Sequence, residues 1–275
     1  DLMVLPTGFC LGTFGVSYAN LHDAARLIDE LRFDSVWLWD HYVSWNDPRE
    51  AVIEGLTALG GIAEVTRHVR IGPLVANNLN RHPGRLAKIA ATLQEMAQGR
   101  FELGIGGGGW KPEQEAFGIE QGSQEERTER VAEALQVLRL LWSGEPVTFH
   151  GRYYRLTDAI VAPAPHPRPP IIVGARGPQL CRIAGRFADG LNVQWRDRAR
   201  LDEQMAALDE GLAEAGRTRA GFDLSVHADW RDLYPDPVAA LERWKALGFT
   251  RAIIYVAAPF PGDGLRRIAQ ELHLV

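Results

Sequence analysis

The sequence predicts an α/β fold, a (β/α)8 TIM barrel with an insertion before its fifth strand. Short apolar runs alternate with longer segments of helical period, and this alternation indicates strands that pair in parallel. It repeats eight times in 275 residues, about 34 residues per unit, which matches such a barrel in number and length. An open doubly wound sheet is the alternative, but it needs no particular number of strands. We expect residues 1–275 to form one domain.

The first four units lie between residues 8 and 142. In each unit a short apolar run predicts the strand, and apolar residues three to four positions apart predict the helix that follows. Asn20 to Asp23 can cap the first helix, and Leu86, Ala90 and Leu93 share one face of the third. In order, the expected strand and helix pairs are 8–12 and 20–31, 35–39 and 50–66, 68–76 and 83–98, and 101–105 and 125–142.

The second half repeats the pattern less regularly. It begins with residues 143–170, which are rich in proline and aromatic residues and have no low-complexity character. We expect this segment to be an insertion that forms a structural flap. The pairs expected after it are 171–173 and 178–186, 190–193 and 201–215, 224–227 and 237–247, and 252–256 and 264–272.

The composition excludes several classes of function. The net charge is −5, from 30 Lys and Arg against 35 Asp and Glu, which argues against a nucleic-acid-binding protein. The longest apolar run, residues 252–260, is far shorter than the ~18 residues of a membrane span, and the first residues lack the pattern of a signal peptide. Cys10 and Cys181 are too few for a disulfide framework or a four-cysteine zinc site. We therefore expect a cytoplasmic protein that acts on a small molecule, with no metal, nucleic-acid or membrane partner.

The carboxyl ends of the strands should carry the function, because active sites of such barrels are built there. This rule selects a rim that is rich in aromatic and amide side chains and holds a glycine loop and an Asp-His pair. A broad aromatic or conjugated ligand fits such a lining. The selected residues are 13–14, 40–41, 76–78, 106–110, 174–177, 192–195, 227–230 and 257–260.

Two glycine-containing turns on this rim are candidate ligand sites. Residues 104–109 formally fit G-x-G-x-x-G, but a Rossmann fingerprint belongs to the first unit of its fold and this run opens the fourth. A loop that lets backbone approach a planar ring or phosphate is favoured over a structural turn. Residues 174–177 precede a helix, whose free N–H groups and Arg176 favour an anion.

His41, which follows Asp40, is the candidate acid or base. Imidazole titrates near neutral pH, and the neighbouring carboxylate could hold one tautomer. Contact with a bound ring and a purely structural place on the rim are the alternative roles. No other histidine lies nearby in sequence to build a metal site, and the chain has neither a G-x-S-x-G elbow nor a P-loop.

A chain of motifs in register also resembles a known family. The motifs are WLWDH at 37–41, LTAL at 56–59 with TRHVRIG at 66–72, PGRLA at 83–87, GRFELGIG at 99–106, Gly109–Trp110 with Glu113 and Gly118, Arg127 with Glu133, LW at 141–142, Phe149 with Gly151 and Tyr154, and PIIVG at 170–174. Between residues 9 and 195 the sequence resembles the luciferase-like monooxygenase superfamily, most closely its F420-dependent oxidoreductases.

The resemblance implies a barrel that binds a flavin-type ring at its carboxyl face, against a bulge after the third strand that often holds a non-proline cis peptide. It also implies a homodimer. The Asp-His pair lies near the ring in F420-dependent members, where the His can act in catalysis. The Glu that serves the sugar-phosphate dehydrogenases of this group corresponds here to Gly109. The cofactor contacts implied are Leu74, Ala76, Asn77, Gly106, Gly107, Gly108, Trp110, Gly174, Ala175, Arg176 and Gly177.

The main functional hypothesis is an F420-dependent oxidoreductase that moves a hydride between the deazaflavin and a small organic substrate, with His41 and Asp40 as the catalytic pair. An FMN-dependent monooxygenase of the same superfamily is one alternative, because FMN and F420 share a ring outline and a phosphate. A non-catalytic flavin-binding protein is the other. Barrel packing is the alternative role for each tryptophan of the expected substrate pocket. The residues expected there are Phe14, Trp39, Trp45, Trp195 and Trp230.

Overall fold

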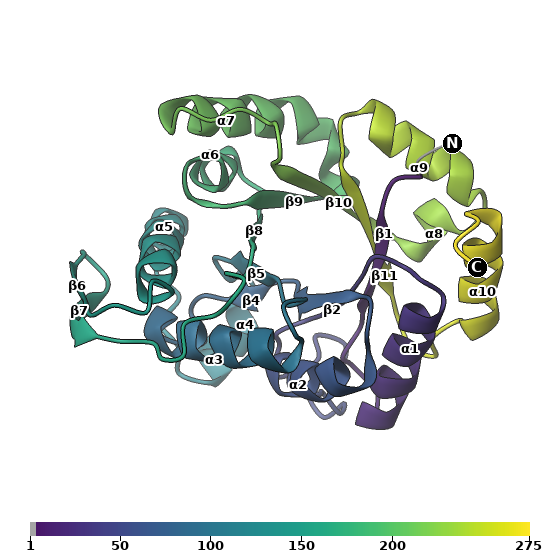
Figure 1. The fold of residues 1–275 in the computed structure, drawn as a ribbon, viewed down its shortest axis with the longest axis horizontal. Helices are drawn as coiled ribbons and strands as arrows, with labels where there is room; N and C mark the ends of the chain where they lie inside the picture. The colour runs from purple at the N-terminus through teal and green to yellow at the C-terminus, as the bar shows by residue number, and fades with distance from the viewer. Residues whose placement is uncertain (1–3) are drawn as a thin grey trace.

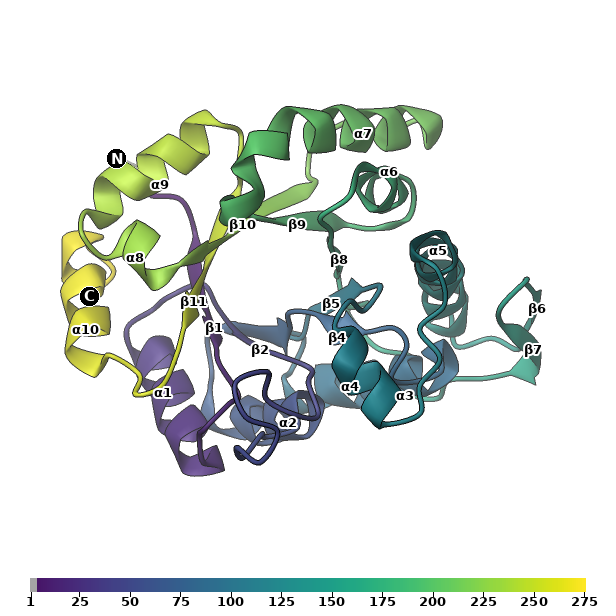
Figure 2. The same ribbon diagram turned by 180° about the vertical axis from the view of Figure 1, so that it is seen from behind.

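A ring of parallel strands surrounded by helices forms the body of the protein (Figures 1 and 2). The computed structural model describes residues 4–275. Nine strands make one sheet in the order β3-β2-β1-β11-β10-β9-β8-β5-β4, and all neighbours pair in parallel. Their bounds are β1 Thr7–Leu11, β2 Ser35–Leu38, β3 Arg70–Pro73, β4 Ala76–Asn77, β5 Leu103–Gly106, β8 Ile171–Gly174, β9 Gly190–Gln194, β10 Asp223–Asp229 and β11 Arg251–Val256.

The two ends of this sheet meet, which closes the barrel. β3 and β4 are two parts of the third barrel strand, separated by Leu74 and Val75, and the peptide bond between these two residues is cis. β4 pairs with β5, and an isolated parallel bridge joins Ile71 of β3 to Phe101 just before β5. The predicted eight-stranded barrel is therefore confirmed, and so is the non-proline cis peptide at the third strand.

Eight long helices cover the outside of the described barrel. They are α1 Tyr18–Glu30, α2 Gly55–Val65, α3 Pro83–Met96, α5 Gln124–Leu141, α6 Pro178–Phe187, α7 Leu201–Glu214, α9 Pro237–Ala246 and α10 Gly262–Glu271. The helix expected over 50–66 begins only at Gly55, because Val52 bridges to Phe14 at the rim and the Glu54 side chain caps the helix by accepting from Thr57 N. Three short helical segments were not predicted, namely α4 Lys111–Ala116, η1 Trp195–Arg200 and α8 Trp230–Leu233.

Side chains that alternate along the strands form two separate cores. The larger core lies between the strands and the helices, and the smaller one lies inside the barrel. At the amino ends of the strands the buried Arg251 fills the interior, where it bonds Glu102 at 2.8 Å, pairs with Asp223 and lies 5.2 Å from the Trp37 ring. This packing leaves the carboxyl ends as the side on which a ligand can be bound. The inner core consists of Cys10, Trp37, Leu74, Ile172 and Ile253.

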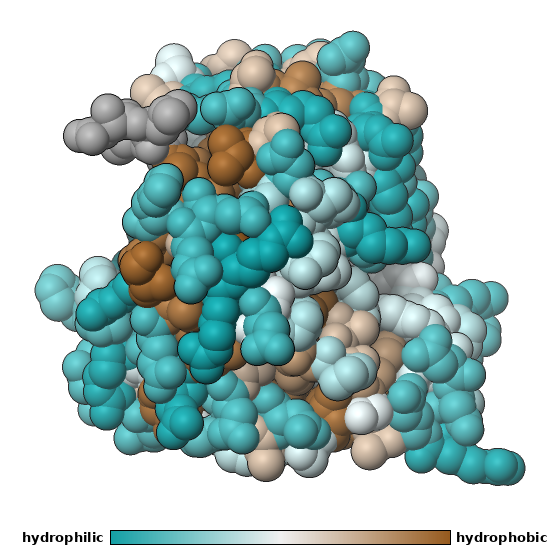
Figure 3. Space-filling view, turned by 90° about the vertical axis from the view of Figure 1, so that its right-hand side faces the viewer, coloured by the Kyte–Doolittle hydropathy of each residue, from teal (hydrophilic) through white to brown (hydrophobic). Residues whose placement is uncertain are grey.

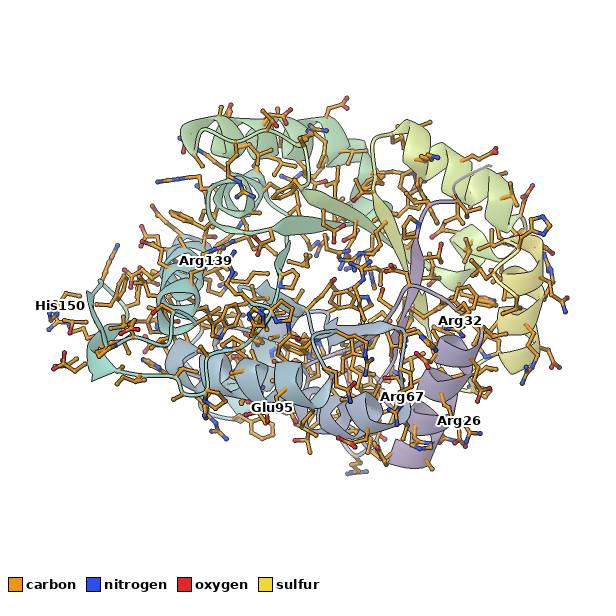
Figure 4. All side chains as sticks on the ribbon, in the orientation of Figure 1. Arg26, Arg32, Arg67, Glu95, Arg139 and His150 are labelled. Carbon is orange, nitrogen blue, oxygen red and sulfur yellow. The ribbon has the colours of Figure 1, made fainter. Side chains whose placement is uncertain are left out.

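The segment 143–170 contains an antiparallel hairpin of β6 Val147–His150 and β7 Arg155–Ala159. It projects beside α5 at the edge of the barrel (Figure 1), and His150 lies at its outer side, far from the barrel axis (Figure 4). Glu133 of α5 accepts bonds from the backbone of the turn, and Tyr154 accepts a 3.0 Å bond from Asn78 at the end of β4. The expected flap is thus a hairpin that is anchored to α5 and reaches the rim.

The outer surface is mainly hydrophilic on the side of α1, α9 and α10, where apolar side chains show only in patches (Figure 3). Among residues 4–275, none of the helices has the length and apolar character needed to span a membrane.

Candidate active site

His41 lies at the carboxyl end of β2 and contacts a buried carboxylate. Its Nδ1 is 3.2 Å from Oε2 of Glu113, which comes from α4 and is 1% exposed. The same carboxylate accepts bonds from Tyr42 N at 2.7 Å and Val43 N at 3.3 Å. Glu113 therefore fixes both the loop that follows β2 and the orientation of the imidazole ring.

Glu113 is held in its charged form. Burial alone would raise its pKa, but the hydrogen bonds from His41, Tyr42 and Val43 outweigh that effect and lower the pKa below its ordinary value. A carboxylate bonded to one imidazole nitrogen fixes the orientation of the ring and which nitrogen carries the proton. The pair can therefore hold or release a proton at the free nitrogen of His41.

Asp40 does not contact this ring, so the prediction that it tunes His41 is wrong. Its carboxylate forms two bonds with Arg81, at 2.6 and 2.8 Å, and accepts a third from Asn77 N at 2.7 Å. These three bonds direct the Asp40 side chain toward the loop between β4 and α3 and away from Glu113. The buried Asp40–Arg81 ion pair instead connects the segment after β2 to the loop between β4 and α3.

Aromatic rings surround His41. Phe14 lies 5.8 Å, Trp45 5.2 Å and Trp110 6.1 Å from the His41 ring, measured between centroids. Trp39 lies 6.3 Å away. These four residues and His41 are the aromatic cluster of the site. Because Trp45 is 47% exposed, the cluster opens to solvent at the rim.

Tyr255 of β11, which was not predicted, extends this cluster. Its ring stacks on that of Trp39 with a centroid distance of 4.6 Å and an interplanar angle of 10°. Its position two residues after the lumen residue Ile253 could have identified it, because alternate strand residues face the same side.

Trp195 and Trp230 do not join the cluster. Trp195 packs edge-on against Trp244 of α9 at 5.9 Å, and Trp230 stacks with Tyr234 at 5.0 Å and lies 6.3 Å from Phe9 in the outer core. Each is the first residue of a helical segment, η1 and α8, and the turn directs its side chain into the strand–helix layer. Placing these two residues in the substrate pocket was therefore wrong.

Val75 forms a ledge inside the barrel between two glycines. A Cβ at Gly106 or at Gly174 would come within 2.6 Å of a Val75 methyl group, so neither position tolerates a side chain without movement. Leu74 beside it belongs to the inner core. The predicted bulge, the glycine loop after β5 and the turn after β8 thus meet at one place on the rim.

Other predicted cofactor residues can offer only their backbone. The side chains of Ala76 and Ala175 are buried in the strand–helix layer. Gly108 has a φ of +70°, which favours glycine, and the Asn77 side chain occupies the space beside it. At Gly107 the backbone lies against Arg127 of α5.

The turn after β8 presents an uncapped helix end. Gly177 is the N-cap of α6 and offers no side-chain bond to the first turn, so the N–H groups there are open to an anion. Arg176, expected to add a free positive charge, bonds Asp197 at 2.7 and 3.2 Å instead. Its charge is therefore already matched by a carboxylate.

Several buried polar atoms at the rim have no hydrogen-bond partner within the protein. They are Oγ1 of Thr13, Oδ1 of Asn78, Oε1 of Gln194 and Nδ1 of His227. Buried polar groups are nearly always paired in folded proteins, so these atoms point to a ligand with hydrogen-bonding edges. A deazaflavin, with a pyrimidine edge, a planar ring and a phosphate, fits this set together with the Val75 ledge and the open end of α6. Within residues 4–275 no cluster of His, Cys, Asp and Glu side chains could hold a metal ion.

Comparisons with known proteins agree with this geometry. The sequence model of the family described as luciferase-like monooxygenase matches residues 3–229. An F420-dependent glucose-6-phosphate dehydrogenase of Microbacterium testaceum is 37% identical over 237 residues, which cover 84% of this chain and 70% of that protein. A 5,10-methylenetetrahydromethanopterin reductase of Archaeoglobus fulgidus is 31% identical over 78% of this chain and 60% of its own length.

Solved structures show the same fold. An F420-dependent secondary alcohol dehydrogenase, in complex with an F420-acetone adduct, superposes with a TM-score of 0.86 and 22% identity, covering 99% of both chains. A coenzyme F420 dependent tetrahydromethanopterin reductase from Methanopyrus kandleri gives a TM-score of 0.82 and 19% identity over 98% of both chains.

Proposed function

Because this chain belongs to the luciferase-like monooxygenase family, we propose that it is an F420-dependent oxidoreductase acting on a small organic substrate. The observation that carries the proposal is the His41–Glu113 pair, which lies among aromatic rings on the rim that also holds the Val75 ledge. The relatives named as F420-dependent support the choice of cofactor.

The rim offers a surface for each part of the cofactor. Val75 and the backbone of Gly106 and Gly107 would support the planar ring, and the first turn of α6 would receive the phosphate. Residues 74–77 would offer backbone groups to the ring edge. When bound, F420 supplies the hydride acceptor or donor; the protein supplies binding, orientation and proton transfer.

His41 moves the proton in this proposal. In alcohol oxidation the substrate loses its carbon-bound hydrogen as hydride and its hydroxyl proton to His41, and the carbonyl product forms; reduction reverses both transfers. Glu113 orients the ring through its contact with Nδ1, which makes it a positioning residue. A substrate bound against the aromatic cluster would displace water from the site of the transfer.

Two further properties are proposed on the family resemblance. The chain would form a homodimer through barrel helices, and it would act in the cytoplasm. Light scattering of the purified protein measures the first property directly, and a monomer at micromolar concentration would contradict it.

Cofactor titration and one variant test the proposed function. In titrations monitored by fluorescence, we expect the Kd of F420 to be at least tenfold lower than that of FMN. Equal or tighter FMN binding would favour the monooxygenase alternative. His41→Ala should lower kcat by about 10²–10⁴-fold with the F420 Kd within tenfold. His22→Ala on α1 is the matched control, and a full-rate His41→Ala enzyme would remove His41 from the site.

A further inference from the structure

Two neighbouring strands present unpaired polar side chains on the inside of the barrel. Gln194 of β9 and His227 of β10 are register partners, and His227 also pairs with Ile253 of the inner core. Residues in register on adjacent strands point to the same side of a sheet, so both side chains face the barrel interior. Neither Oε1 of Gln194 nor Nδ1 of His227 has a partner in the protein.

This wall is electrically neutral at physiological pH. Burial and, to a smaller extent, the charge of Arg196 lower the pKa of His227 to about 4, against the opposing effect of Asp229. The charge of Asp229 is matched by Arg231 at 2.9 Å, and the Arg196 side chain is exposed to solvent, which screens its charge. Gln194 and neutral His227 therefore offer amide and imidazole hydrogen bonds without a charge.

Gly109 has no role in folding that would require glycine. A Cβ there meets no atom within 4 Å, and its φ lies outside the left-handed region, unlike that of Gly108. Glycine lowers stability relative to alanine at an ordinary backbone conformation. Gly109 is exposed and directly precedes Trp110 of the aromatic cluster, so the space beside its backbone is open to the bulk of a substrate.

We propose that the reacting hydroxyl or carbonyl oxygen of an uncharged substrate lies between His41, which exchanges its proton, and Gln194 and His227, which hydrogen-bond it, while the other rings of the aromatic cluster and the space at Gly109 hold an apolar, ring-sized remainder. The substrate class is thus uncharged cyclic or aromatic alcohols and ketones, in contrast to the sugar phosphate that several relatives are named for. This inference rests on the proposed function, since it concerns the substrate of the same site.

The direct test compares substrates on the F420-loaded enzyme. Cyclohexanol and 1-phenylethanol represent the uncharged class, and glucose 6-phosphate represents the anionic class. The loss of F420 absorbance measures the rate of hydride transfer with each substrate. We expect kcat/KM to be at least 100-fold higher for one of the uncharged alcohols. Preference for glucose 6-phosphate, or turnover of none of the three while F420 binds, would overturn the substrate class. Absence of F420 binding would instead overturn the proposed function.

Variants test the two polar residues separately. Gln194→Leu and His227→Leu should each raise KM for the preferred alcohol about tenfold, equivalent to about 1.4 kcal/mol, with the F420 Kd within threefold. His227→Gln, which keeps a neutral hydrogen-bonding group, should restore most of the lost affinity. Gln136→Leu on α5 and His150→Leu on the hairpin are matched controls (Figure 4). If the Leu variants weaken F420 binding and leave KM unchanged, these residues bind the cofactor and the proposal is wrong.

Discussion

Replacing Glu113 by glutamine separates its charge from its shape. In Glu113→Gln the side-chain oxygen can still accept from Tyr42 N and Val43 N, so the loop after β2 keeps its contacts. The contact with His41 loses the negative charge. Hydrogen bonds to a charged group contribute about 1.5–3 kcal/mol and neutral ones about 0.5–1.5, so the free energy of unfolding should fall by about 1–2 kcal/mol.

For a chain of this size, 1 kcal/mol corresponds to a change in Tm of about 2–4 °C, so we expect Tm to fall by about 2–8 °C at pH 7. The pKa of Glu113 is lowered in the folded state, so its charge stabilises the protein above the unfolded pKa of about 4.3. This stabilisation is lost as the pH falls through the lower folded pKa. The difference in Tm between wild type and Glu113→Gln should therefore shrink below pH 4.

Glu115→Gln is the matched control, because Glu115 lies on the same helix, is exposed and pairs with Lys111 at 3.2 Å. Such a surface pair contributes about 0–1 kcal/mol. Thermal unfolding followed by circular dichroism from pH 3 to pH 8 measures both variants, and hydride transfer at saturating F420 measures the chemistry. We expect kcat of Glu113→Gln to fall about 10–100-fold with a shifted pH profile. Equal Tm values at every pH, or an unchanged pH–rate profile, would refute the reasoning.

Three further substitutions test other parts of the site. Asp40→Asn leaves the Arg81 guanidinium buried without its charged partner, so urea unfolding should show a loss of about 3–5 kcal/mol, and a loss below 1 kcal/mol would contradict this role for the pair. Gly106→Ala should lower the free energy of unfolding by about 1–3 kcal/mol and weaken F420 binding, because the new methyl group collides with Val75. Gly109→Ala is the matched control. Its methyl group meets no atom, so the free energy of unfolding should stay unchanged or rise slightly. Equal stabilities of the two alanine variants would argue against the Val75 ledge.

The periodic parts of the fold were predictable from sequence. Alternating apolar runs and helical segments predict eight strand–helix units, and a strand of period two places the lumen residues Trp37 and Trp39 on the same side. The family motifs also predict the position of the cis peptide between Leu74 and Val75.

Contacts between distant segments were not predictable. His41 and Glu113 are separated by 72 positions and Asp40 and Arg81 by 41, so only the closed barrel brings each pair together. Adjacency in sequence suggested Asp40 as the partner of His41, but tertiary packing supplied Glu113. A strand pattern also does not determine where a side chain points once the strand ends.

The closure of the barrel constrains how the protein can be made. β1 pairs with β11, in a register that runs from Thr7 opposite Ala252 to Leu11 opposite Val256. One edge of the first strand therefore stays unpaired until the last strand has been synthesised. Such long-range pairing slows folding and leaves strand edges exposed on a nascent chain. The family sequence model ends its match at residue 229, before β11. The stretch beyond the family match thus contains the strand that closes the barrel, and a chain that lacks it would leave the edges of β1 and β10 without a partner.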